Sequence, residues 1–441
     1  GRGARRLVGR APCTRHPWPC LTPPRVSTYR SIRHRDTCAP PASRRWAGGG
    51  DEGIFVRLGA AASSRLPRAG QAGHGGGPQE DGFDSHLKSG ENQVYPGNNF
   101  DYHLIPFQAA IDNGMKVVMP YYGIPVGQTD EDVAMAFNKY ILTDLLRDQM
   151  NFEGVVCTDW GIIEGRHWGV GDLSISERYE KSINAGVDQY GGENKPEFVV
   201  ELVNEGKITE ERINASVRRI LTNKFELGLF ENPFVDESLV KELVNKKDYI
   251  EQGLDAQRKS IVLLSNKDNT LPLTNNLNIF VDGIDEDVAS RFGNIVDNHE
   301  NADYVILFLN TVFNGQQPSG IDRVLDNMLA TMFPNNDLDY NDEINAKIEK
   351  YSKESKLIIV SDLNRPAILT NANEKSLGLI GTFGVEDKVI LETIFGENNP
   401  TGKLPFEIPS SMEEVKEQFS DVADDTKNPI FKYGHGLSYP E

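Results

Sequence analysis

The chain has 441 residues, with 65 acidic residues against 46 Lys and Arg and a hydrophobic fraction of 38%. These values describe a soluble, acidic chain long enough for two to three domains. No run approaches the roughly 18 to 20 consecutive apolar residues of a membrane-spanning helix, and the net charge of −19 argues against a nucleic-acid partner. The charge is uneven, because residues 1–74 hold 14 Arg, no Lys and three acids, which leaves 32 bases and 62 acids in residues 75–441.

Residues 1–74 contain eight Pro and ten Gly and show no helical or strand periodicity. Such a segment cannot bury enough apolar surface to offset the entropy of ordering, so we expect it to be disordered and unrelated to the rest. An organelle transit peptide is the alternative, because the segment is rich in Arg and poor in acids, although its prolines oppose an amphipathic helix. Cys13, Cys20 and Cys38 lack the paired spacing of a zinc site, so we expect free thiols.

Residues 75–235 alternate short apolar runs with helical patterns, which is typical of parallel strands joined by helices. The runs that predict strands are 115–120, 154–158 and 185–190, and the patterns that predict helices are 133–150, 176–185 and 196–227, the last broken near Gly206. Asn232-Pro233 ends this block, and residues 236–254 are charged and poorly patterned. We therefore expect a linker there, between one domain at 75–235 and a second at 255–441.

Residues 255–441 repeat the alternation, with strands that are largely apolar on both faces. The predicted strands are 260–264, 277–281, 304–309, 356–361 and 377–382, and two predicted helices are 341–352 and 387–395. Strands of this kind belong in a sheet that helices cover on both sides. The sequence therefore predicts an α/β fold in both blocks.

The most informative segment is Gly154 to Trp160, a short apolar strand that runs directly into Thr158-Asp159-Trp160-Gly161. An acid at the carboxyl end of a strand is exposed at the catalytic face of an α/β barrel, which makes Asp159 a candidate nucleophile. The neighbouring Trp160 offers an apolar platform for a sugar ring. The structural alternative is that Asp159 is only the N-cap of a following helix.

Four further segments give this candidate a context: Ser260 to Asn266 with Leu271-Pro272-Leu273, Pro400 to Phe406, Tyr433 to Tyr439, and Thr209 to Phe230. With these motifs, in this order and spacing, the chain resembles glycoside hydrolase family 3, the β-glucosidase-like group, over about residues 75–441. The resemblance implies a (β/α)8 barrel followed by an α/β sandwich. It also implies an O-glycosyl hydrolase that acts on terminal β-linked sugars of a glycoside or oligosaccharide, without metal or organic cofactor.

The resemblance carries the nucleophile of a retaining mechanism onto Asp159. A second carboxyl group, about 5 to 5.5 Å away, would protonate the leaving oxygen and later activate water. The family commonly supplies that acid/base from its second domain, in the loop after the strand at 304–309. Five acids lie in or just beyond this loop, and none can be assigned: Asp322, Asp326, Asp337, Asp339 and Glu343.

Three further residues are candidates for substrate contact. Trp160 would carry the sugar ring, and His86 falls where the family has an Asp-Pro-His element. Asp188, in the next strand, is either a sugar contact or a structural residue that holds neighbouring loops. Glu386 is interpreted as a helix-start acid that the helix dipole favours.

The chain also departs from the family pattern. Gln71 and Ala72 stand where the family has a Lys and a His that bind substrate hydroxyls. The three strands of the first block correspond to the last three of eight, so we expect a barrel that cannot close, and slow or no hydrolysis by this chain. A catalytically silent remnant or carbohydrate-binding fragment is therefore one alternative function, and a β-N-acetylhexosaminidase-type enzyme is another. The family suggests a secreted or periplasmic protein, yet no signal peptide is visible; sugar identity and oligomeric state are not predicted.

Overall fold

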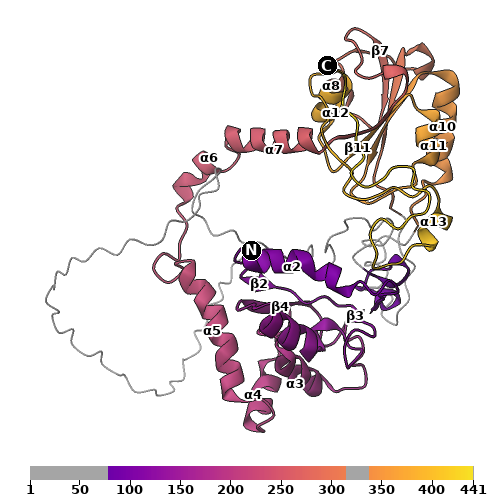
Figure 1. The fold of residues 1–441 in the computed structure, drawn as a ribbon. Helices are drawn as coiled ribbons and strands as arrows, with labels where there is room; N and C mark the ends of the chain where they lie inside the picture. Colours follow the sequence, from indigo (N-terminus) through magenta and orange to yellow (C-terminus); the bar gives the residue numbers. More distant parts are fainter. Residues whose placement is uncertain (1–77, 314–336, 441) are drawn as a thin grey trace, which may run out of the picture. The chain divides into compact units, whose positions relative to one another are not determined.

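The computed structural model describes residues 78–313 and 337–440 (Figure 1). The predicted disorder of residues 1–74 lies outside these ranges, as do Asp322 and Asp326. Within the described ranges, no helix combines the length and the apolar composition needed to cross a membrane. The described residues have an α/β fold with two larger sheets, of three and six strands, and a separate pair of two-residue strands.

The smaller of these sheets has three parallel strands in the order β2-β4-β5. They are β2 (Val117–Val118), β4 (Val155–Trp160) and β5 (Gln189–Gly191). The register pairs Val117 with Val155 and Cys157 with Gln189. A separate parallel pair is formed by β1 (Asn92–Gln93) and β3 (Ile124–Pro125). All three strands predicted for this block are therefore present, and they are parallel as predicted.

The helices of this block are α2 (Ile105–Asp112), α3 (Ile175–Ala185), α4 (Pro196–Asn204) and α5 (Glu210–Glu226). Helix α3 begins with a capping box, in which Ser174 and Glu177 bind each other's backbone N–H groups. The break predicted near Gly206 separates α4 from α5. The helix predicted at 133–150 is instead a short 3-10 turn followed by a π-helix at Tyr140–Gln149. Hydrophobic spacing could not distinguish these forms, since it does not report which carbonyl each N–H binds.

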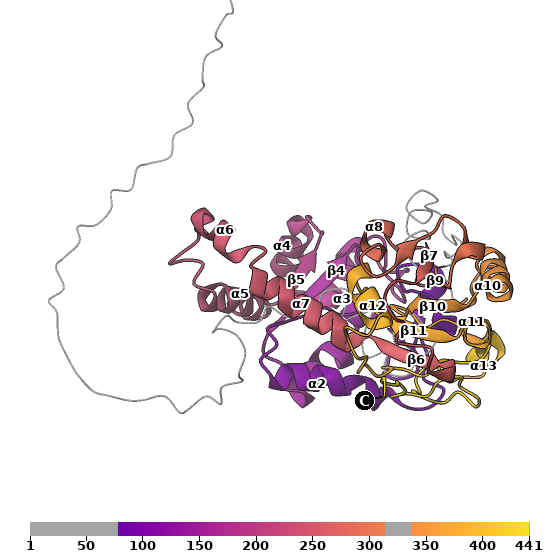
Figure 2. The ribbon, with the colours of Figure 1, turned by 90° about the horizontal axis from the view of Figure 1, so that it is seen from above.

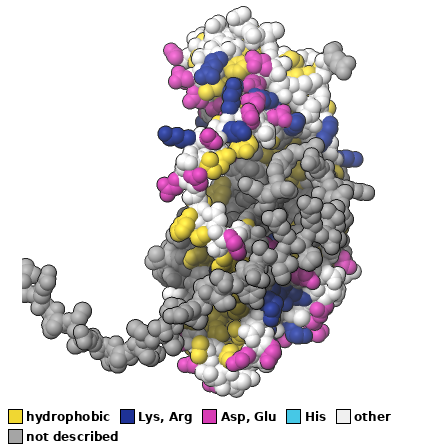
Figure 3. All heavy atoms as spheres, turned by 90° about the vertical axis from the view of Figure 1, so that its left-hand side faces the viewer, with side chains coloured by type: hydrophobic (Ala, Val, Ile, Leu, Met, Phe, Trp, Pro, Cys, Tyr) yellow, Lys and Arg dark blue, Asp and Glu magenta, His cyan; other side chains and the backbone are white. Residues whose placement is uncertain are grey.

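Two apolar clusters fill the core of this block. One contains Val118, Val156 and Val187, with the helix residues Leu142 and Leu146. The other lies under α3 and α4 and includes the turn that follows β4. Part of α5 remains uncovered by described residues, because Val217, Leu221 and Phe225 are 38 to 58% exposed. Their spacing of four places them on one helix face. Figure 3 shows one side of the molecule, on which groups of hydrophobic side chains lie between charged ones.

The larger sheet has six strands in the order β6-β11-β10-β9-β7-β8. They are β6 (Val262–Asn266), β7 (Asn278–Asp282), β8 (Asn294–Ile295), β9 (Tyr304–Leu309), β10 (Leu357–Asp362) and β11 (Gly378–Thr382). All pairs are parallel except β6 with β11. The five predicted strands are present within two residues, and the two-residue β8 was not predicted because it is too short to show a pattern.

Helices cover both faces of this sheet, as the apolar strands predicted (Figure 2). They are α8 (Glu286–Ala289) and α12 (Asp387–Ile394) on one face, and α10 (Asp342–Glu354) and α11 (Thr370–Lys375) on the other. Along β10, Ile358 and Val360 belong to the first core while Leu357 and Ile359 belong to the second. A further short helix is α13 (Met412–Lys416).

The segment at 236–254 contains helices that its sequence pattern did not predict. These are α6 (Val240–Leu243) and the start of α7 (Lys247–Ser260). Many side chains of this segment are exposed, and among its apolar residues Leu254 packs against the core of the six-stranded sheet. A single apolar residue that packs against the core does not produce the apolar helical spacing from which a helix is predicted.

Candidate active site

Asp159 lies where β4 ends, because the buried residues Val155 and Val156 fix the strand in the core and the chain then turns away. Gly161 makes the turn with φ of +74°, a conformation that costs glycine little. Residues 161–165 form turns, and the next helix, α3, begins only at Ile175. Asp159 therefore caps no helix, which removes the structural alternative for this residue.

The Asp159 carboxylate lies in a small polar cluster. Its Oδ1 accepts a hydrogen bond from the Trp160 N–H at 2.7 Å, and its Oδ2 is 3.9 Å from His86 Nε2. The other ring nitrogen of His86 lies 2.5 Å from Asp84 Oδ1, so Asp84 orients the imidazole. The three side chains are each only 10 to 16% exposed. The structure thus brings together Asp159 and His86, two of the residues selected from the sequence.

Tyr122 belongs to the same cluster and was missed by the sequence analysis. Its hydroxyl donates a hydrogen bond to the Trp160 carbonyl oxygen at 2.5 Å, and its ring lies edge-on to His86 at 4.9 Å. Burial raises the pKa of Tyr122 above its ordinary value, and the Asp159 charge raises it further, so the phenol stays protonated. The Arg166 guanidinium, 5.6 Å from the Tyr122 ring centre, opposes that shift.

The Trp160 side chain is 69% exposed and so offers the apolar surface proposed for it. The ring rests on Gly192, which has φ of +73° and no room for a side chain, since an added Cβ would lie 2.2 Å from the indole. A second tryptophan, Trp168, donates its indole N–H to the Ser85 carbonyl oxygen at 2.9 Å. That bond ties the Asp84 to His86 segment to the loop after β4.

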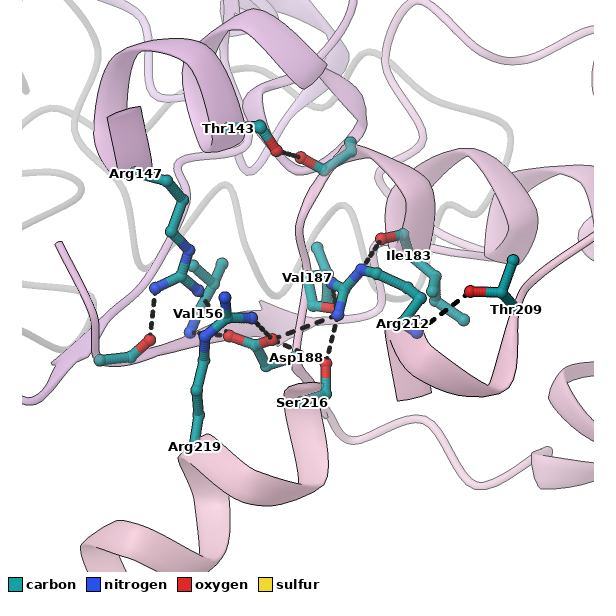
Figure 4. Close-up of polar contacts among 12 residues, drawn as sticks. Thr143, Arg147, Val156, Ile183, Val187, Asp188, Thr209, Arg212, Ser216 and Arg219 are labelled. Atoms are coloured by element: carbon teal, nitrogen blue, oxygen red, sulfur yellow. Dashed lines mark hydrogen bonds and ion pairs between the residues drawn. The ribbon is translucent and has the colours of Figure 1, made fainter. Parts of the chain in front are cut away.

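Asp188 lies among three arginines, as Figure 4 shows. Its carboxylate is fully buried and contacts Arg147 at 2.6 Å, Arg219 at 2.8 Å and Arg212 at 3.5 Å. Burial alone would raise the pKa of Asp188, but hydrogen bonds from Ser216 and the Val156 N–H, together with the arginines, lower it below the ordinary value. Both carboxylate oxygens are therefore occupied by protein groups.

The remaining acid candidates have their own surroundings. Burial and the charges of Asp337 and Glu413 raise the pKa of Asp339. Glu343 is in the first turn of α10, and Glu386 stands at the N-cap position of α12, as interpreted from the sequence.

Among the described residues, His299, Glu300 and Glu354 could share a metal ion, and there His299 Nε2 lies 2.5 Å from Glu354 Oε2.

An α/β fold with a carboxylate at the carboxyl end of a parallel strand occurs in many enzymes, and two family models identify the family of this chain. The Glycosyl hydrolase family 3 N terminal domain matches residues 71–223, and the Glycosyl hydrolase family 3 C-terminal domain matches residues 280–439. The chain belongs to glycoside hydrolase family 3, as its motifs predicted.

Curated relatives agree with this assignment. The chain is 42% identical to the probable beta-glucosidase C of Aspergillus flavus over an alignment of 379 residues that covers 83% of this chain and 58% of that protein. It is 35% identical to the periplasmic beta-glucosidase/beta-xylosidase of Dickeya chrysanthemi over an alignment of 390 residues that covers 83% of this chain and 59% of that protein. The chain therefore spans somewhat more than half the length of these relatives.

A solved structure has the same fold. The beta-glucosidase from Listeria innocua in complex with isofagomine aligns with a TM-score of 0.66 at 22% identity, over 82% of this chain and 57% of that one.

Proposed function

We propose that this chain carries the catalytic nucleophile of a retaining glycoside hydrolase of the β-glucosidase type, and that Asp159 is that nucleophile. The observation that carries the proposal is the position of Asp159, at the carboxyl end of β4 with no helix to cap. The identity to relatives named as β-glucosidases supports the same substrate class, a glycoside with a terminal β-linked sugar.

In this mechanism the Asp159 carboxylate attacks the anomeric carbon while the bond from that carbon to the leaving oxygen breaks, and an acid/base residue protonates the leaving oxygen. Water, deprotonated by the same residue, then hydrolyses the glycosyl-enzyme and releases the sugar. The Trp160 N–H, at 2.7 Å, fixes one carboxylate oxygen, and His86 faces the other. The exposed Trp160 ring would stack on the sugar, and His86 would donate a hydrogen bond to a hydroxyl group. The acid/base residue is not assigned.

We also propose that β2, β4 and β5 are the last three strands of a (β/α)8 barrel, and that the larger sheet with its helices is the family's sandwich domain. Within the described residues, β2 and β5 each pair on one side only, and the match covers only 58 to 59% of each relative's length. In such a barrel Asp188 has a structural role, because both of its oxygens are occupied. The chain alone would then hydrolyse substrate slowly or not at all.

The proposal is tested with a chimera that joins residues 78–441 to the upstream part of the Aspergillus flavus protein. We expect the chimera to hydrolyse an aryl β-glucoside at about 1 to 10³ per second and Asp159→Asn in that chimera to lose several orders of magnitude in kcat. An inactive but folded chimera would favour the silent remnant. Preference for an aryl N-acetyl-β-glucosaminide would favour the hexosaminidase-type alternative.

A further inference from the structure

The three arginines around Asp188 carry more positive charge than one carboxylate balances (Figure 4). Arg147 also donates to the carbonyl oxygens of Phe152 and Gly154, at 2.9 and 2.6 Å. Burial, together with the neighbouring Arg219 and Arg212, lowers the pKa of Arg147 to about 10 although Asp188 opposes the shift. The cluster is therefore electropositive, and no second carboxylate of the described residues contacts these guanidinium groups.

Arg219 is the member of the cluster with the most unused donors among the described contacts. Arg212 donates to the carbonyl oxygens of Ile183 and Val187 and to Ser216, in addition to Asp188. Arg219 uses one nitrogen, Nη1, for Asp188 and is 30% exposed. Within the described ranges its other two nitrogens have no hydrogen-bond partner.

A groove of about 390 Å³ opens beside Arg219, between α5 and the residues that immediately precede β2 and β4. Arg218, Thr222 and Asn223 line it from α5. The side chain of Arg218 makes no hydrogen bond or ion pair with a described residue, and neither does the Asn223 amide. Two acids, Glu153 and Glu226, also line the groove. Glu226 is paired with Lys116 at 2.9 Å, so the negative charge of Glu153 is set against the positive charges of Arg218 and Arg219.

We propose that this groove binds a small oxyanion, a phosphate or sulfate group, through the guanidinium groups of Arg218 and Arg219 and the amide of Asn223. Hydrogen bonds from an arginine to a charged oxyanion are stronger than hydrogen bonds between neutral groups, and the planar guanidinium can bind two oxygens at once. The groove lies at the start of β4, whereas Asp159 lies five residues further along, at about 3.3 Å per residue and so about 16 Å away. The inference is thus independent of the glycosidase proposal.

The test measures binding to the full chain with inorganic phosphate as the probe, by isothermal titration calorimetry at fixed ionic strength balanced with NaCl. Fixed ionic strength matters because exposed charges are screened over about 10 Å at 0.1 M salt. We expect one phosphate per chain and at least about tenfold weaker binding in Arg218→Gln, which removes an exposed side chain that holds no described partner. The matched control is Lys224→Gln, which removes one charge from the same helix outside the groove and should leave phosphate affinity unchanged.

A second arm replaces phosphate with glucose 1-phosphate, because a sugar phosphate and the free ion would present the same group. Tighter binding of the ester identifies a phosphorylated metabolite as the ligand, and equal or weaker binding identifies the free oxyanion. Absence of saturable phosphate binding overturns the proposal. Binding that is the same in Arg218→Gln and in the unsubstituted chain overturns it as well.

Discussion

Replacing Asp188 with Asn should destabilise the part of the chain around the three-stranded sheet more than any other single carboxylate change there. The substitution keeps the shape but removes the only negative charge that the described residues place against Arg147, Arg212 and Arg219, and it turns an amide NH2 toward donors. Removing one partner of a buried ion pair typically costs about 3 to 5 kcal/mol. With a urea dependence of about 1 to 3 kcal/mol per molar, the unfolding midpoint should fall by about 1 to 5 M.

The assay is urea denaturation followed by tryptophan fluorescence. Trp160 and Trp168 lie in this part of the chain, and residues 255–441 contain no Trp, so the signal does not come from the six-stranded sheet. The control is Asp144→Asn, because Asp144 forms an exposed pair with Lys139 at 3.3 Å, a kind of contact worth about 0 to 1 kcal/mol. Equal midpoints for Asp188→Asn and Asp144→Asn would refute the reasoning.

The stability difference between the unsubstituted chain and Asp188→Asn should also depend on pH. The pKa of Asp188 is lowered in the folded state, so its stabilisation is present above the unfolded pKa of about 3.9 and is lost as the pH falls through the folded value. The stability difference between the unsubstituted chain and Asp188→Asn should therefore be constant from about pH 5 to 8 and shrink below about pH 4. A difference that grows on acidification would contradict the assigned direction of the shift.

Three smaller changes test the surroundings of the site. Gly192→Ala should displace the Trp160 ring, because its Cβ would lie 2.2 Å from the indole, and the Trp fluorescence maximum should shift; an unchanged spectrum would contradict the contact. Tyr122→Phe should cost about 0.5 to 1.5 kcal/mol in urea unfolding, because it removes the hydrogen bond to the Trp160 carbonyl. Ser174→Ala should cost about 1 kcal/mol, because it removes the cap of α3, whereas Ser174→Asp should restore most of that loss.

The local parts of the fold could be predicted from the sequence because their causes are local. The apolar run at 154–158 predicts β4, and Gly206 predicts the break between α4 and α5. The position of Asp159 follows from the same strand. By contrast, Arg147, Arg212 and Arg219 are 24 to 41 residues away from Asp188 in sequence, and no pattern along the chain indicates that they meet.

The position of Tyr122 after a strand could be predicted from the sequence, but its proximity to Asp159 could not. It follows β2 by four residues, so the rule that selected Asp159, a polar residue just beyond a strand, could have selected it. Its proximity to Asp159 depends on the parallel pairing of β2 with β4, which no residue within the segment specifies. The π-helix at Tyr140–Gln149 and the two-residue β8 are likewise invisible to periodicity.

The central claim is that Asp159 is a glycosidase nucleophile, and trapping its glycosyl-enzyme tests it most directly. The chain, alone and joined to the upstream part of the Aspergillus flavus protein, is incubated with an activated 2-fluoro β-glucoside and analysed by intact-protein mass spectrometry and peptide mapping. We expect one added glycosyl group in the joined protein, on the peptide spanning residues 154–166, and none in its Asp159→Asn variant. Labelling of a different carboxylate, or equal labelling of Asp159→Asn, would contradict the account.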